Sequence, residues 1–198
     1  MTRPRSVDPV KLIAAVLWSD AAALAEALGL VENHWGPIDF AGPDHPFDVT
    51  RYYESEMGPQ IFRRIISFTR LVPPESIREA KLTCNEIEDS LAAGGGRRVN
   101  LDIGYIDHNK VVLASAKYAG QKIHLGDGIY ADMIARYRDG KYRPFEWTFP
   151  DFRDGRYDQE LGSIRASYLS SLRSSRHSRG PEVRTGPAVA QMKPGDEQ

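Results

Sequence analysis

The side chains in this sequence that could carry chemistry are carboxylates and imidazoles in and around one long segment, residues 41–60, and in later segments. Such groups serve as ligands for hard cations and as general acids and bases. No pair among them has a recognised metal-ligand spacing, and His45 with Asp48 comes nearest, so the pattern specifies neither a metal nor a cofactor. The full set is His34, Asp39, His45, Asp48, Glu54, Glu56, Asp102, His108, His124 and Asp127.

One of these carboxylates lies in a segment that alternates. Residues 98–105 place apolar side chains at every second position, which predicts a strand whose other face carries Asn100 and Asp102. If that face of the sheet is open to water, the pair is solvated; if helices cover it, both side chains need partners. The sequence leaves both readings open for Asp102. His124 raises the same question, because it faces away from its apolar neighbours in another predicted strand.

Our leading hypothesis is a site for a small molecule or a phosphate ester, formed where the 41–60 segment meets the later polar residues. In this hypothesis Asp102 and His124 are the catalytic residues: a carboxylate serves a metal or a proton, and His124 does acid/base work. The ligand-binding residues would be Asp48, Tyr52, Tyr53, Glu54, Glu56, Asn100, Asp127 and Tyr130.

Nucleotide binding is a further reading, because three short strings follow the order of the later motifs of a GTPase. They are Asp39-Phe-Ala-Gly42, Asn109-Lys110 and Ser115-Ala-Lys117. The sequence has no G-x-x-x-x-G-K-[ST] loop to hold phosphates, and no acid follows Asn109-Lys110 to contact guanine. These absences argue against a P-loop GTPase and leave GTP binding without a P-loop as an alternative.

Composition limits the classes of partner. The 26 basic and 27 acidic side chains nearly cancel, so no overall field favours nucleic acid or an anionic membrane. The only cysteine, Cys84, excludes an intramolecular disulfide and a cysteine-rich zinc site, which favours a cytoplasmic protein. A protein of another class, a noncatalytic adaptor that recruits a protein through a basic tail and exposed aromatic residues, fits the same composition. The oligomeric state is not indicated.

The chain opens with a βα unit. Residues 11–18 are mostly apolar without interruption, which predicts a strand covered on both faces. Ser19 or Asp20 can cap the next helix, and we expect that helix to end at Gly29. A second strand is expected at residues 36–40.

The 41–60 segment has no clean period, so we expect a loop with one helical turn at most. Residues 61–71 predict a strand. Residues 77–91 repeat apolar side chains at three and four residue steps, which predicts an amphipathic helix with Cys84 packed on its apolar face, and Ser76 with Glu79 has capping-box spacing.

The second half is expected to begin with a helix over residues 107–118, although Val111 and Val112 leave a strand as the alternative. A meander then follows, and apolar spacing from Leu161 to Leu172 predicts a closing helix. The meander strands are expected at residues 121–125, 129–137 and 141–147, with Asp139-Gly140 as the last turn.

These elements predict the α+β class. We expect a two-layer sandwich with a mixed or antiparallel sheet, in which a ferredoxin-like βαββαβ start is followed by a helix, a β-meander and a C-terminal helix. Residues 1–10 would form an N-terminal arm, residues 11–172 a single domain and residues 173–198 a disordered tail, since the tail has little apolar surface to bury.

Four strings stand out in the sequence: Phe47-Asp-Val-Thr-Arg-Tyr-Tyr-Glu-Ser-Glu-Met-Gly58, Arg98-Val-Asn-Leu-Asp-Ile-Gly-Tyr105, His124-Leu-Gly-Asp-Gly-Ile-Tyr-Ala131 and Trp147-Thr-Phe-Pro-Asp151. Together they resemble the bacterial domain of unknown function 4416 family, over about residues 11–172. The resemblance implies a domain without an assigned chemistry. Some relatives carry the label "GTP-binding protein", which the missing phosphate loop does not support.

Overall fold

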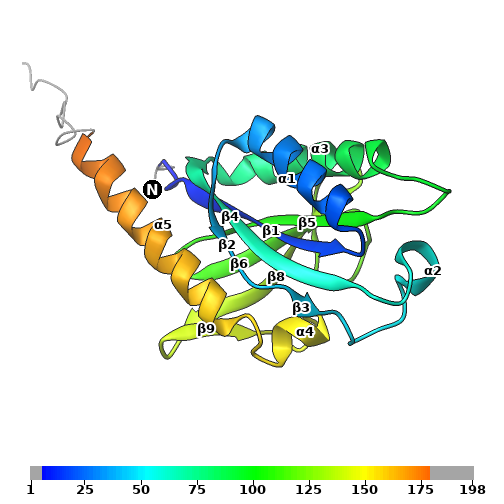
Figure 1. Cartoon of the computed structure of the whole chain (residues 1–198). Helices are drawn as coiled ribbons and strands as arrows, with labels where there is room; N and C mark the ends of the chain where they lie inside the picture. Colours follow the sequence, from blue (N-terminus) through cyan, green and yellow to red (C-terminus); the bar gives the residue numbers. More distant parts are fainter. Residues whose placement is uncertain (1–5, 179–198) are drawn as a thin grey trace, which may run out of the picture.

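A computed structural model describes residues 6–178, with side chains described up to Arg176. Its centre is one large antiparallel sheet with helices on both faces (Figure 1), so the predicted α+β class is confirmed. The strands are β1 (Val10–Trp18), β2 (Ile38–Ala41), β3 (His45–Pro46), β4 (Phe62–Val72), β5 (Val99–Ile106), β6 (Lys110–Ser115), β7 (Ile123–Gly126), β8 (Ile129–Arg138) and β9 (Lys141–Pro144). The helices are α1 (Ala21–Trp35), α2 (Glu54–Met57), the 3-10 turn η1 (Pro74–Ser76), α3 (Ile77–Ser90), α4 (Pro150–Arg153) and α5 (Asp158–Ser178).

The strands lie in the order β2-β4-β1-β5-β6-β8-β7, with β3 beside β4 and β9 beside β8. All pairings within this order are antiparallel. Residues 10–17 of the central strand β1 are all buried, as expected for a strand covered on both faces. No helix in the described part of the chain combines the length and the hydropathy that crossing a bilayer demands.

Helix α1 begins as the sequence indicates, because the carboxylate of Asp20 accepts hydrogen bonds from the amides of Ala22 and Ala23 at 2.8 and 3.1 Å. Its predicted end at Gly29 is wrong. Gly29 lies inside the helix with no atom within 4 Å of the place where its Cβ would be, and the helix continues to Trp35. The true end is Gly36, whose φ of 86° is a left-handed value that favours glycine.

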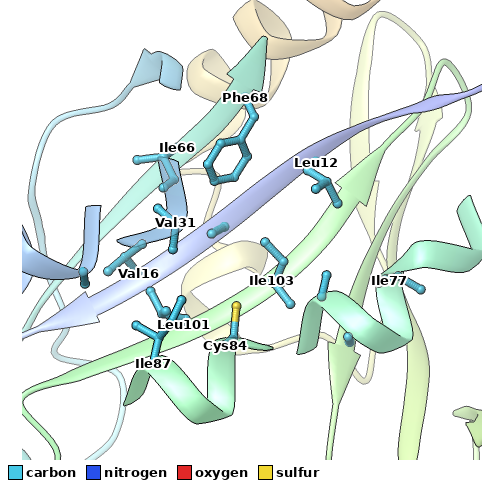
Figure 2. Close-up of a cluster of buried hydrophobic side chains, with 14 of the residues drawn as sticks. Leu12, Val16, Val31, Ile66, Phe68, Ile77, Cys84, Ile87, Leu101 and Ile103 are labelled. Carbon is cyan, nitrogen blue, oxygen red and sulfur yellow. The ribbon is translucent and has the colours of Figure 1, made fainter. Parts of the chain in front are cut away.

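Helices α1 and α3 pack on one face of the sheet, and Figure 2 shows the core between these helices and the strands. Cys84 is fully buried there, and burial raises the pKa of its thiol, so its predicted role as inert packing agrees with its environment. The predicted capping box is wrong. Ser76 belongs to η1, and its hydroxyl donates to the carbonyl of Pro73 at 2.7 Å, so it caps nothing in α3.

Helices α4 and α5 cover the opposite face, where Phe152, Leu161 and Ile164 pack against the sheet. The predicted two-layer arrangement is therefore wrong, and the domain has three layers. The physical reason is already in β1: a strand that is apolar on both faces must bury both. Helix α5 runs six residues past Leu172, while residues 179–198 of the predicted tail lie outside the described residues.

The predicted helix over residues 107–118 is wrong, and that segment forms β6. Its β-branched pair Val111 and Val112 is buried within the sheet, where a pleated strand accommodates branching better than a helix does. The predicted meander is confirmed in β7, β8 and β9. Asp139 and Gly140 form its last turn, both with positive φ (51° and 84°).

Candidate functional site

The two strands at the middle of the sheet, β5 and β6, stay together over only part of their length. They pair from Gly104 to Ile106, opposite Val111 to Leu113. At Gly104 the strands are so close that a Cβ would lie 2.1 Å from the carbonyl oxygen of Val112, which only glycine allows. The other half of β5, residues 99–103, has no paired strand on that edge. The sheet therefore opens between β5 and β6.

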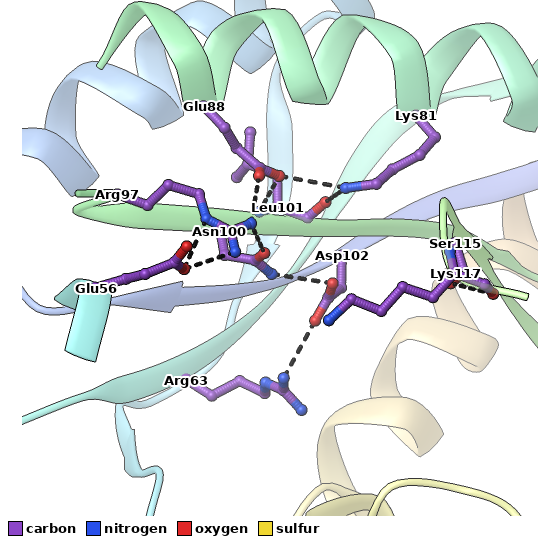
Figure 3. Close-up of polar contacts among 10 residues, drawn as sticks. All are labelled: Glu56, Arg63, Lys81, Glu88, Arg97, Asn100, Leu101, Asp102, Ser115 and Lys117. Atoms are coloured by element: carbon purple, nitrogen blue, oxygen red, sulfur yellow. Dashed lines mark hydrogen bonds and ion pairs between the residues drawn. The ribbon is translucent and has the colours of Figure 1, made fainter. Parts of the chain in front are cut away.

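Two side chains of α3 occupy the open edge (Figure 3). The amide of Leu101 donates to Glu88 Oε1 at 2.8 Å, and Lys81 Nζ donates to the carbonyl of Leu101 at 3.0 Å. Lys81 and Glu88 also pair with each other at 3.2 Å, and both are buried. They satisfy backbone groups that a neighbouring strand would otherwise satisfy.

A pocket of about 520 Å³ lies at this opening. We call it the split-sheet pocket, and its volume falls in the range typical of small-molecule sites. Its walls come from both sides of the sheet and from the segment after β3. They are formed by Phe47, Val49, Thr50, Tyr52, Tyr53, Arg63, Lys81, Asn85, Glu88, Arg97, Asn100, Asp102, residues 113–117, Lys122, Asp132, Phe149 and Pro150.

The wall nearest β5 is a chain of paired polar groups. Arg97 donates to Glu56 Oε2 at 2.7 Å, to Glu88 Oε2 at 3.2 Å and to Asn100 Oδ1 at 2.9 Å. Asn100 in turn donates to Asp102 Oδ1 at 3.0 Å. Partial burial works against the charge on Arg97, but the hydrogen bonds to the two glutamates outweigh it and raise the pKa of the guanidinium. Arg97 therefore stays charged and hydrogen-bonded to the two glutamates and Asn100.

Arg63 closes this wall from β4. It is 1% exposed, and its guanidinium pairs with Asp102 at 3.2 Å and, more closely, with Asp151 of α4. The guanidinium also lies 4.7 Å from the ring centre of Phe47 and 5.5 Å from that of Phe152. Asp102 is therefore fixed by an ion pair with Arg63 and by the hydrogen bond from Asn100.

The opposite wall is less fully paired. Lys122 Nζ donates to Ser115 Oγ at 2.8 Å and lies 3.5 Å from Asp132 Oδ2. The other oxygen of Asp132 is buried and has no hydrogen-bond partner among the described residues. Burial raises the pKa of Asp132, although the charge of Lys122 opposes that shift.

Two tyrosines stand at the mouth of the pocket. Lys117 Nζ donates to the hydroxyl of Tyr52 at 2.8 Å and lies 4.2 Å from the centre of its ring. Figure 3 shows the side chain of Lys117 extending from just beyond β6 toward β5. Tyr53 is more enclosed: burial first, and the charge of Asp102 second, raise its pKa to about 12. Its phenol is therefore a neutral hydrogen-bonding group near pH 7.

The structure brings about half of the sequence-predicted site residues to this place. Tyr52, Tyr53, Asn100 and Asp102 line the pocket. Glu56 joins them through its ion pair with Arg97. The 41–60 segment and the polar face of β5 therefore meet, as the leading hypothesis expects.

The predicted residues of the β7–β8 hairpin do not line the pocket. Asp127, in the hairpin turn with a φ of 51°, pairs with Arg78 of α3 at 2.6 Å. His124 packs beside Tyr130, with ring centres 5.1 Å apart. Asp102 and His124, which the leading hypothesis pairs as catalytic residues, therefore do not share this pocket.

Two acids of the 41–60 segment also lie elsewhere. Asp48 is 71% exposed and pairs with Arg156 at 3.1 Å, and Glu54 is 42% exposed and lies 3.7 Å from Arg51. His45 contacts Glu160 at 2.6 Å. Within residues 6–178 no three His, Cys, Asp or Glu side chains gather as metal ligands would.

Several pocket residues were missed by sequence reasoning, although two signals were present. Arg63 is followed by another arginine inside a predicted strand, so one of the two had to face inward. Lys81 and Glu88 lie three before and four after Cys84, which places them beside its apolar stripe. Lys122 and Asp132 gave no comparable signal, because only the pairing of strands places them together.

Comparison with family models identifies the chain. The model of the domain of unknown function DUF4416 matches residues 8–168. The chain belongs to this family. All residues that line the split-sheet pocket lie within the matched segment. Comparison with curated proteins and with solved structures gives no match.

Proposed function

We propose that the split-sheet pocket binds a small organic anion, and that phosphate esters are the class it suits best. The observation that carries this proposal is the set of contacts made by the ammonium group of Lys117. Its contacts are a neutral hydroxyl and an aromatic ring, and the structure gives it no carboxylate partner among the described residues. An ammonium group at a pocket mouth can therefore pair with a ligand anion without first breaking an ion pair.

The remaining walls support the same class. Arg63 and Arg97 are held by carboxylates, so they add rigidity to one wall and leave Lys117 as the cation available to a ligand. Tyr52, Tyr53 and Phe149 supply aromatic surface for the carbon part of a ligand. The proposal is one of binding, and it does not include a reaction shared by Asp102 and His124.

The experiment is calorimetry with phenyl phosphate, glycerol 3-phosphate, ATP and GTP on the full chain. The Lys117→Met variant should bind the best of these at least tenfold more weakly, because it loses one charge-assisted hydrogen bond. Arg143→Met is the control: Arg143 is exposed on β9, outside the pocket, and its loss changes net charge by the same amount. Equal loss in both variants, or no binding of any phosphate ester, would refute the proposal.

We also propose a cytoplasmic location. It rests on the single cysteine of the sequence, which allows no disulfide within the chain, as is usual for proteins of a reducing compartment. Fractionation of cells that express the full chain tests it, and recovery outside the cytoplasmic fraction would contradict it.

A further inference from the structure

We infer that the ligand of the split-sheet pocket carries an ammonium group in addition to its phosphate, and that Asp102 binds the ammonium group while Lys117 binds the phosphate. This inference rests on the proposed function and narrows it to phosphorylated amines, such as aminoalkyl phosphates. It starts from the distribution of charge between the two walls of the pocket.

The wall nearest β5 carries one negative charge in excess when each group is in its usual state near pH 7. Arg97 pairs with Glu56 at 2.7 Å. Lys81 pairs with Glu88 at 3.2 Å. Among the described residues of this wall, the remaining cation is Arg63, and two carboxylates share its guanidinium, namely Asp102 and Asp151. One cation therefore faces two anions, and the charge of one carboxylate stays unbalanced.

Asp102 is the carboxylate at which this excess charge reaches the pocket. The side chain of Asp151 is 0% exposed and does not line the pocket, whereas that of Asp102 lines it and is 21% exposed. The two oxygens of Asp102 accept one hydrogen bond each, from Asn100 at 3.0 Å and from Arg63 at 3.2 Å. Each carboxylate oxygen can accept two, so Asp102 can accept further hydrogen bonds from a ligand.

The phenol of Tyr53 gives further support, because it lines the same pocket and responds to the same charge. Burial first, and the charge of Asp102 second, raise the pKa of Tyr53 to about 12. Arg63 and Arg97 lower that pKa, but each has a smaller effect than Asp102. A second negative charge is therefore disfavoured beside Asp102, and a positive charge is favoured there.

The opposite wall has the reverse balance. Lys122 lies 3.5 Å from Asp132, which is the one carboxylate of this wall among the described residues. Lys117 is left with the hydroxyl and the ring of Tyr52. Lys117 and Asp102 do not neutralise each other, because they form no ion pair, and Figure 3 draws both side chains without a contact between them. The pocket therefore holds one unbalanced charge of each sign.

A phosphate ester without an amine balances only one of these charges. Its phosphate pairs with Lys117, but its carbon part displaces water from Asp102 and replaces that water with apolar surface, which is unfavourable for a carboxylate. An ammonium group at the same place donates charge-assisted hydrogen bonds to Asp102. A ligand with both groups therefore balances both walls.

The test is calorimetry on the full chain with esters that differ in one group. O-phosphoethanolamine is paired with n-propyl phosphate, and O-phosphotyramine with 4-propylphenyl phosphate; the first of each pair has an ammonium group where the second has a methyl group of similar size. In at least one pair the amine should bind about tenfold or more tightly than its partner, because it gains charge-assisted hydrogen bonds.

Asp102→Asn removes the charge and retains an oxygen that can accept a hydrogen bond from Arg63. It should reduce the ratio within each pair to near one without weakening the binding of n-propyl phosphate, because it takes negative charge out of the pocket. Asp139→Asn is the control: Asp139 is 66% exposed in the β8–β9 turn, outside the pocket, and its loss changes net charge by the same amount. This control should keep the full preference for the amine.

Intermolecular nuclear Overhauser effects on the natural chain locate the amine even if Asp102→Asn does not fold. The methylene group next to the ammonium group should show an effect to the β protons of Asp102, and its absence from the saturated complex would overturn the inference. A preference that persists in Asp102→Asn also overturns it. If the esters bind but neither pair shows a preference, this inference fails and the proposed function stands. If no ester binds the natural chain, both fail.

Discussion

The two halves of β5 find hydrogen-bond partners for their backbone groups on the β6 side in different ways. From Gly104 to Ile106 the strand pairs with β6, and the contact is made by main-chain atoms. In the other half no strand pairs with this edge, and side chains meet it at Leu101: Lys81 donates to the carbonyl of Leu101, and Glu88 accepts from its amide. The paired half makes the sheet continuous, and the open half creates the pocket.

The difference has energetic consequences. Main-chain pairing tolerates many side chains, but it depends on the missing side chain of Gly104. The open half depends on charged groups, each of which has several partners and can be replaced singly. Substitution of Gly104 should therefore act in an all-or-none manner, while substitutions around the open half should have graded effects on stability.

The largest effect is expected at the junction. In Gly104→Ala the new Cβ meets a backbone oxygen at 2.1 Å, so β6 must move away, and we expect a loss above ~5 kcal/mol in the free energy of unfolding. Urea unfolding, or the absence of soluble folded protein, measures it. Gly29→Ala is the control: it fills open space inside α1 and should stabilise the protein by ~0.5–1 kcal/mol. A mild effect at Gly104 would mean that the strands separate easily.

The second prediction concerns the buried cation behind the open half. Arg63→Met leaves Asp102 and Asp151 without their shared partner, and we expect a loss of ~3–5 kcal/mol, measured by urea unfolding. Arg64→Met is a matched control on the opposite face of the same strand. Arg64 is 24% exposed and pairs with Asp44, so its loss should be below ~1 kcal/mol. Similar losses at both positions would show that the burial of Arg63 contributes little to the free energy of unfolding.

The third prediction addresses the side chains that replace a strand. Lys81→Met removes the donor to the carbonyl of Leu101 and the partner of Glu88, and we expect a loss of ~1–3 kcal/mol. Hydrogen exchange at the amide of Leu101 should become faster than in the natural chain, which locates the effect at the open edge. Lys141→Met, which breaks a half-exposed ion pair with Asp158, should change stability by less than ~1 kcal/mol and leave that amide unaffected.

The smallest effect on stability is expected at Asp132, on the opposite wall of the pocket. Here the substitution should stabilise the protein, whereas the three preceding substitutions destabilise it. Because burial raises its pKa in the folded state above the unfolded value near 3.8, the folded protein loses stability as pH rises from the unfolded pKa through the folded one. Asp132→Asn removes that loss. The variant should melt higher than the natural chain at pH 7 in a thermal unfolding scan, and the two should converge below pH 3.8.

Asp39→Asn provides the contrast. Burial opposes the charge of Asp39, but hydrogen bonds from Lys11 and Ser67 outweigh it and lower the pKa. Its contribution is therefore present above the unfolded pKa and is lost as pH falls through the folded one. This variant should melt lower than the natural chain at pH 7. A common direction for both aspartate variants would contradict the assigned environments.

The sequence by itself determined most of the elements and the polar face of one strand. The alternation in residues 98–105 was sufficient to place Asn100 and Asp102 on the same side, because side-chain direction in a strand follows from parity alone. Helix α3 followed from its apolar period in the same way. The segment 107–118 was mistaken for a helix, because a short apolar run fits either state until its neighbours are known.

Only the tertiary structure decided where the pocket lies and which residues form it. Parity shows that His124 faces away from its neighbours, but it does not show that the hairpin carrying it lies outside the cavity. Lys122 and Asp132 meet because β7 and β8 pair in one register, and Arg63 meets Asp151 across 88 positions of sequence. Such contacts depend on long-range strand order and on the point where β5 and β6 part, which local patterns do not encode.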